Sequence, residues 1–280
     1  MFTEVATRLL GQIATELSGP DVIFPTSFDL SLRVQSLLKN PDTTIEQLSG
    51  LIQAEPLMST KILTYANSAA VRGGGQEIPE LGRAILRIGF DAVRTVSYSL
   101  SVEQIIRSKH MQPFQPLSNA IWEHSLAVAA IARILARRRR MNPEKAFFLG
   151  MVHDIGAFYL LFRCSQDPTL AANREELLQT VYEWHDGIGH ALLAAMDQPE
   201  DILFAVQDHE APTTVSSLSN WTAVLASADC LGQQIADWVP AEMRAGCPRF
   251  VSESLISAEE QAEIMLQAKE ELATLRAALF

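Results

Sequence analysis

Cysteine is scarce in this sequence: three residues of 280, far apart along the chain. Cys164, Cys230 and Cys247 are odd in number and form no C-x-x-C pair, which argues against a disulfide framework or a cysteine-based zinc site. We therefore interpret them as reduced thiols that serve as packing residues, and expect a cytoplasmic protein.

Long apolar runs and an excess of positive charge are also lacking. We find no apolar stretch of membrane-spanning length, and the segment around Glu4 lacks the basic start and apolar run of an export signal. Acidic residues outnumber basic ones by 33 to 22, for a formal net charge of −11. This negative charge disfavours nonspecific binding to nucleic acid and to anionic lipid, so we expect no nucleic-acid and no membrane partner. The basic cluster at residues 137–140 is interpreted as the solvated C-terminal end of a helix.

What is abundant is apolar sequence at helical spacing, with 48% hydrophobic residues overall. Turn residues punctuate the pattern, and it predicts an all-α protein. Helices are expected at residues 3–17, 29–38, 56–69, 78–88, 91–106 and 258–279, among others. The last of these could dock on its own chain through Ile264, Leu272 and Leu275, which is the default, or form a partner or dimer contact.

Several local signals refine this pattern. Thr43 and Glu46 have the spacing of a capping box at the start of a helix. Asn67 and Ser68 precede a glycine run and are expected to satisfy backbone groups at the end of a helix. Gly89 should interrupt the helical pattern, and the two prolines in residues 110–116 mark the best candidate domain boundary.

The most informative stretch is FFLGMVHDIGAF, residues 147–158, which places His153 and Asp154 within an apolar run. Two unpaired ionisable side chains in a core would cost several kcal/mol, so they need partners. The best partners are a metal ion or a hydrogen-bonded network of the polar residues themselves.

Other polar residues lie on or beside apolar helical faces. His124 falls on a stripe of aliphatic residues, and Asp229 shares a face with Trp221 and Leu225. His185 and His209 lie between these two positions in the chain. The remaining histidines are excluded from this set, because His110 lies off any apolar face and His190 points away from His185 on a helix.

These residues carry a resemblance. The order of His124, His153-Asp154 and Asp229 on separate helices resembles the HD metal-dependent phosphohydrolase superfamily. The stretches FPTSF, LSGLIQAEPLMSTKILTYANSA and IPELGRAILRIGFDAV are similar to those that precede the HD-like core in its HDOD (HD-related output domain) branch. The resemblance implies an N-terminal helical subdomain packed on an HD-like helical core. It also implies a bacterial signalling protein.

The resemblance further implies a metal site. Its expected ligands are His124, His153, Asp154 and Asp229 for a first ion, with His185 and His209 for a second. Asp154 would then bridge the two ions, and nitrogen and carboxylate ligands suit iron, manganese or zinc.

Departures from the related HD-GYP phosphodiesterases affect the expected function. Ala157 stands where those enzymes have lysine, and His209 is followed by Glu210 rather than a second histidine and a GYP loop. Two hypotheses follow. The chain is a regulatory HDOD module that acts through a protein partner or a small phosphorylated ligand, or it is a metal-dependent phosphohydrolase, with Asp154 essential if it is active. The sequence leaves open whether the protein forms a homo-oligomer.

The expected organisation has three parts. Residues 1–23 form an N-terminal helix and residues 24–239 the HDOD domain, divided into a helical subdomain at 24–112 and an HD-like core at 117–239. Residues 240–280 form an extension that begins irregularly around Gly246 and Pro248 and contains the amphipathic helix.

Overall fold

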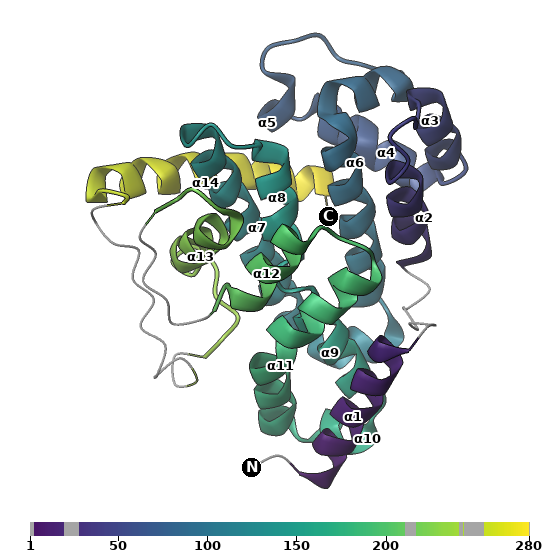
Figure 1. Cartoon of the computed structure of the whole chain (residues 1–280), viewed down its shortest axis with the longest axis vertical. Helices are drawn as coiled ribbons and strands as arrows, with labels where there is room; N and C mark the ends of the chain where they lie inside the picture. The colour runs from purple at the N-terminus through teal and green to yellow at the C-terminus, as the bar shows by residue number, and fades with distance from the viewer. Residues whose placement is uncertain (1–2, 20–27, 211–216, 241–242, 244–254, 280) are drawn as a thin grey trace.

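A computed structural model of the chain describes residues 3–19, 28–210, 217–240, 243 and 255–279 (Figure 1). The described residues form helices and no strand, which confirms the all-α prediction. The first half contains α1 (Glu4–Ser18), α2 (Asp29–Leu38), α3 (Ile45–Gln53), α4 (Pro56–Asn67), α5 (Ala69–Arg72) and α6 (Leu81–Ile106). The second half contains η2 (Lys109–Phe114), α7 (Gln115–Arg138), α8 (Pro143–Val152), α9 (Ile155–Gln166), α10 (Pro168–Ala172), α11 (Arg174–Ala195), α12 (Glu200–Asp208), α13 (Trp221–Gly232) and α14 (Ala258–Leu279).

Some predicted features lie outside the described residues. These are Cys247, the irregular segment with Gly246 and Pro248, and all of the FPTSF stretch except Phe28.

The capping box at the start of α3 lies one residue later than predicted. The Thr44 side chain accepts a hydrogen bond from Gln47 N at 3.3 Å, and the Gln47 side chain accepts one from Thr44 N at 3.0 Å. Thr43 instead donates its hydroxyl to the carbonyl oxygen of Leu37, 2.5 Å away, at the end of α2. Both pairs have the right spacing, so the choice between them depends on the position of the preceding helix.

The polar residues at the end of α4 hold the backbone, as predicted. The Asn67 side chain bonds both the N–H and the carbonyl of Ile78, each at 2.8 Å, and Ser68 donates to the carbonyl of Tyr65 at 2.7 Å. Further on, Gly89 has φ 78° and ψ 170°, outside the helical region, and divides α6 into two segments. The predicted interruption at this glycine is therefore confirmed.

The first and last described helices each pack on the other half of the chain (Figure 1). Helix α1 lies against α10 and α11 of the HD-like core, and Glu16 forms an ion pair with Arg163 at 2.5 Å. Helix α14 packs on α7 and also on α4 and α5, with Leu272 and Leu275 buried. Lys61 on α4 donates to the carbonyl of Leu279 at 3.1 Å. The two halves are therefore joined at both ends, and α14 docks on its own chain.

The basic cluster at residues 137–140 is not simply solvated, as the sequence suggested. It does lie at the end of α7, but Arg138 pairs with Glu263 at 3.1 Å and Arg139 with Glu260 at 3.2 Å. Both acids belong to α14, which could not be placed beside α7 from the sequence. The cluster thus helps to hold α14 in place.

Among the described residues, one segment is long and apolar enough to cross a membrane by length and composition, Pro143–Gln166. This corrects the expectation that the sequence has no such stretch. The segment consists of α8 and α9 with His153 and Asp154 between them, and 89% of its apolar window is buried inside the protein. Its apolar character is explained by its place in the core.

Candidate metal centre

Six polar side chains from four helices and one interhelical turn meet in the HD-like core. They are His124 on α7, His153 and Asp154 between α8 and α9, His185 on α11, His209 at the end of α12, and Asp229 on α13. Each of them is at most 2% exposed. All the residues that the sequence suggested as metal ligands therefore lie together in one buried cluster.

Glycines let the helices approach closely enough to form this cluster. A Cβ atom on Gly150 of α8 would lie 2.4 Å from the Cα of Ala129 on α7. A Cβ atom on Gly156 of α9 would lie only 1.9 Å from the carbonyl oxygen of His185 on α11. Any larger residue would force these helix pairs apart. The glycine after His153-Asp154 thus brings His185 next to Asp154.

Three histidines are oriented by the same local contact. The Nδ1 atom lies beside the carbonyl oxygen three residues earlier, at 2.7 Å for His153, 2.7 Å for His185 and 2.6 Å for His209. A carbonyl can only accept, so Nδ1 carries a proton, and in the neutral ring Nε2 keeps its lone pair. The Nε2 atoms of His153 and His185 are buried without a hydrogen-bond partner among the described residues. Burial also lowers the pKa of His153 to about 4, which keeps its ring neutral.

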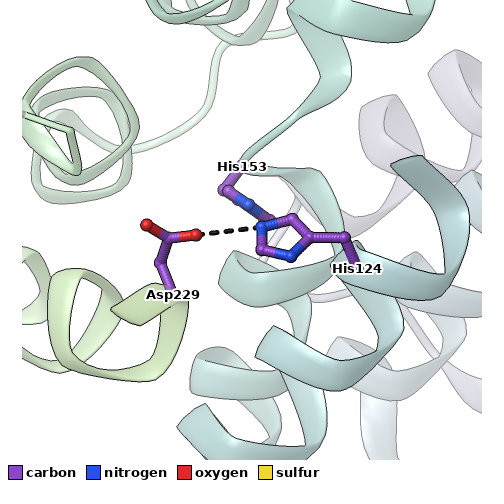
Figure 2. A group of neighbouring side chains, drawn as sticks. All are labelled: His124, His153 and Asp229. Carbon is purple, nitrogen blue, oxygen red and sulfur yellow. Dashed lines mark hydrogen bonds and ion pairs between the residues drawn. The ribbon is translucent and has the colours of Figure 1, made fainter. Parts of the chain in front are cut away.

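His124 faces an acceptor on each side. Its Nδ1 lies 2.8 Å from the carbonyl oxygen of Ala236, and its Nε2 lies 2.9 Å from Oδ1 of Asp229 (Figure 2). A neutral imidazole has one N–H and satisfies only one of these contacts. Burial opposes protonation of His124, but the hydrogen bond and charge of Asp229 outweigh it and raise the pKa to about 9. A positive charge is thus favoured between His124 and Asp229, and a metal ion would supply it in place of a proton.

Asp154 lies between two pairs of histidines. Its Oδ2 atom is 3.3 Å from Nε2 of His153 and 3.9 Å from Nε2 of His124. Its Oδ1 atom is 3.5 Å from Nε2 of His185 and 4.0 Å from Nε2 of His209. Burial tends to raise the pKa of Asp154, but the surrounding histidines hold it below its usual value. Each oxygen of an ionised carboxylate therefore faces its own pair of nitrogen atoms, as a bridging ligand would.

The ligand atoms form three overlapping groups, each within 4.8 Å. The groups are His124, His153 and Asp229; His153, Asp154 and His209; and His185, His209 and Glu210. Figure 2 shows the first group, whose side chains come together from α7, the α8–α9 turn and α13.

Glu210 is a candidate ligand that the sequence interpretation missed, because it was treated only as a departure from a histidine pair. Its Oε1 lies 4.0 Å from Nε2 of His185. Burial opposes protonation of His185, but the charges of Glu210 and Asp154 outweigh this and raise its pKa. The position of Glu210 directly after His209 in the sequence was the signal that could have identified it as a candidate ligand.

Trp238 is a second residue that the sequence did not indicate. Its Nε1–H donates to Oδ2 of Asp154 at 2.8 Å, and its ring lies edge-on to His185 at a centroid distance of 5.5 Å. It follows α13 in an irregular segment, where no periodic pattern marks an inward side chain.

The two excluded histidines lie away from the cluster. His110 is exposed, and His190 packs near Phe204 of α12 with ring centroids 6.3 Å apart. On the same helix His185 faces inward, together with the buried Leu192.

The donor set fits a divalent transition metal. The ligand atoms that face one another in the cluster are histidine Nε2 atoms and carboxylate oxygens, which are all acceptors when the imidazole rings are neutral. Acceptors buried together need protons or a cation between them. Imidazole and carboxylate groups suit iron, manganese or zinc, and the backbone carbonyls that hold the Nδ1 protons orient the rings for metal binding.

Comparison with solved structures identifies proteins of the same fold. A protein from Shewanella amazonensis SB2B, provisionally assigned as a metal-dependent phosphohydrolase, has a structure with a TM-score of 0.68 and 22% identity, covering 96% of this chain and 100% of that one. An HDOD domain protein of unknown function from Geobacter sulfurreducens has a TM-score of 0.60 and 22% identity, covering 99% and 97%. At this level of identity the two structures show a shared fold.

Two sequence comparisons, with a curated protein and with a family model, identify relatives of this chain. The uncharacterized protein YuxH of Bacillus subtilis strain 168 is 26% identical over 206 residues, which are 73% of this chain. The match spans 46% of YuxH, so this chain corresponds to about half the length of that curated relative. The sequence model of the HDOD domain matches residues 24–212. The chain therefore belongs to the HDOD domain family.

Proposed function

We propose that this chain is a regulatory HDOD module whose HD-like core binds one or two divalent transition-metal ions. It acts on a protein partner or responds to a small phosphorylated ligand, as the sequence suggested. The observation that supports the metal most strongly is the pair of buried Nε2 atoms of His153 and His185, which face carboxylate oxygens and have no hydrogen-bond partner among the described residues.

Two features favour regulation over catalysis. The six candidate ligands are at most 2% exposed, and the indole of Trp238 covers Asp154 and His185. In addition, Ala157 is fully buried beside the site and provides no cation for a phosphate group. A substrate would therefore meet a closed site with less positive charge than related phosphodiesterases have.

A metal-dependent phosphohydrolase is the second candidate, because the whole predicted ligand set is retained and gathered in one place. An ion bound there would supply a nucleophilic water at neutral pH and polarise a phosphoryl oxygen. The chain's own residues would hold the ion, and Asp154 would be the ligand shared between two ions.

Elemental analysis of protein purified without chelator tests the metal site. We expect iron, manganese or zinc in the wild type and in His110→Ala, whose side chain lies outside the cluster, and little metal in Asp154→Ala. A wild type that remains metal-free after incubation with each ion would contradict the proposal.

A turnover screen separates the two candidates. Metal-loaded protein is incubated with phosphomonoesters, nucleotides and cyclic dinucleotides. We expect no robust turnover. Hydrolysis that is abolished in Asp154→Ala and retained in His110→Ala would favour the phosphohydrolase instead.

A further inference from the structure

The segment after α13, residues 236–239, contacts the metal centre at two points and is called here the closing segment. The carbonyl oxygen of Ala236 lies 2.8 Å from Nδ1 of His124, and Nε1 of Trp238 lies 2.8 Å from Oδ2 of Asp154. These contacts reach ligands on two different elements, helix α7 and the α8–α9 turn. The closing segment therefore touches both sides of the cluster.

The indole of Trp238 packs against His185 and its neighbour Tyr182. Its ring meets His185 at a centroid distance of 5.5 Å and an angle of 84°, and meets Tyr182 at 6.4 Å and 71°. Trp238 is only 6% exposed. A large side chain thus separates Asp154 and His185 from solvent on this side.

Two other bonds of the closing segment are local. Ala236 N donates to the carbonyl of Gly232, 3.0 Å away at the end of α13, and Val239 N donates to Asp237 Oδ1 at 3.0 Å within the segment itself. By contrast, the bonds to His124 and Asp154 reach across the site. The segment is therefore attached to α13 at one end and bonded to two of the candidate ligands over the cluster.

A carboxylate oxygen has more than one lone pair, so Oδ2 of Asp154 can accept from Trp238 and still face His153 and His124. The indole donor then fixes the rotation of the carboxylate, which decides whether its two oxygens face the two pairs of histidines. Residues that hold a metal ligand in this way typically change metal affinity by about 10–100-fold.

We propose that Trp238 is a positioning residue that orients Asp154 through its indole N–H and closes the metal centre with its ring, so that a small molecule from solvent reaches the ligands only when the closing segment is displaced. This inference rests on the proposed metal site. It adds a specific residue that controls ligand geometry and access.

Two variants separate the two roles. Trp238→Phe keeps an aromatic ring over the site but removes the donor, whereas Trp238→Ala removes both. Trp221→Phe, at the start of α13, is the matched control, because its ring packs near Lys145 rather than on the ligands. Circular dichroism establishes that each variant is folded.

The positioning role is tested by titration with Mn²⁺. We expect Trp238→Phe to bind Mn²⁺ about 10–100-fold more weakly than Trp221→Phe does, because the carboxylate of Asp154 is no longer held. Equal affinities for these two variants would overturn the positioning role.

Closure is tested without metal, by the rate at which diethyl pyrocarbonate modifies His153 and His185, followed by mass spectrometry. Their Nε2 atoms are nucleophilic once solvent reaches them. We expect the modification rate to be about tenfold or more higher in Trp238→Ala than in Trp221→Phe, because the reagent reaches the histidines without prior displacement of the closing segment. An unchanged rate would overturn closure.

The Mn²⁺ titration and the modification rates together distinguish failure of the role of Trp238 from failure of the proposed metal site. A wild type that binds no metal would overturn both the metal site and the positioning role, and the modification rates would still decide closure. Metal binding with equal affinities and equal modification rates would leave the proposed function intact and overturn this inference alone.

Discussion

Two of the buried polar clusters among the described residues differ in which charges and hydrogen-bonding groups they contain. The first surrounds Arg133 of α7, which is fully buried. Its guanidinium donates to Glu271 of α14 at 2.5 Å and to the hydroxyl of Tyr65 at 3.1 Å, and it lies 4.4 Å from the ring centroid of Phe147. Here a cation meets a carboxylate, a hydroxyl and an aromatic face.

The second cluster is the metal centre. It contains acceptors that face one another: Nε2 of His153, Nε2 of His185 and the oxygens of Asp154. The Arg133 cluster contains its own positive charge, whereas the metal centre gains one only by protonation or by binding a cation. Burial alone therefore does not indicate a site. The balance of donors and acceptors does, and this comparison makes four predictions.

The largest expected effect is on the Arg133 cluster. Arg133→Ala removes the buried cation and leaves the carboxylate of Glu271 without its shortest partner, so we expect the free energy of unfolding to fall by about 3–5 kcal/mol. Arg137→Ala is the control, because Arg137 contacts the same carboxylate at 3.3 Å but is 45% exposed. Its loss should be about 1 kcal/mol or less. Urea unfolding measures both, and equal losses would contradict the structural role of Arg133.

The next effect is that of metal removal. A metal present at about 1,000 times its Kd adds about 4 kcal/mol to the stability of the folded state, and a chelator should remove this. We expect the melting temperature of the wild type to fall in EDTA and to recover with added manganese or iron. Asp154→Ala should not respond to either. A wild type that melts at the same temperature with and without chelator would mean that the acceptors are satisfied by protons alone.

A smaller effect is expected at the helix crossing beside the metal centre. In Gly156→Ala the new methyl group meets the carbonyl of His185, so the helices must separate, at about 1–3 kcal/mol. Gly187→Ala is the control on α11, because a Cβ there meets no atom within 4 Å. Alanine should stabilise that helix by up to about 1 kcal/mol. Thermal melts and Mn²⁺ titrations check both variants, and unchanged Mn²⁺ affinity in Gly156→Ala would show that the site does not depend on this crossing.

The smallest effect is expected at the exposed ion pairs of α14. Glu263 pairs with Arg138 but its side chain is 66% exposed. Glu263→Ala should therefore change the free energy of unfolding by about 0.5 kcal/mol or less, and that change should shrink in high salt. Urea unfolding at low and high salt measures it. A loss comparable to that of Arg133→Ala would remove the distinction between buried and exposed arginines on α7.

The sequence by itself was enough to predict the helical class. Periodicity placed His124 and Asp229 on apolar faces, and the resemblance to the HD superfamily implied the full set of His124, His153, Asp154, His185, His209 and Asp229, which the fold brings together. A polar residue on or beside an apolar helical face must enter the core, and glycine or proline marks where helices stop. Gly89 and the Asn67 end of α4 behaved as their local chemistry predicts.

Tertiary structure determined which atoms of distant segments meet, and helical periodicity does not specify those contacts. Trp238 lies in an irregular segment, so its inward direction depends on where α13 ends relative to Asp154. The capping box uses Thr44 because α2 brings the carbonyl of Leu37 within reach of Thr43. Likewise, the two oxygens of Asp154 face different pairs of histidines only because α7, α11 and α12 approach the α8–α9 turn from different sides. Local spacing sets which face of a helix is buried, whereas contacts between distant segments set which atoms meet there.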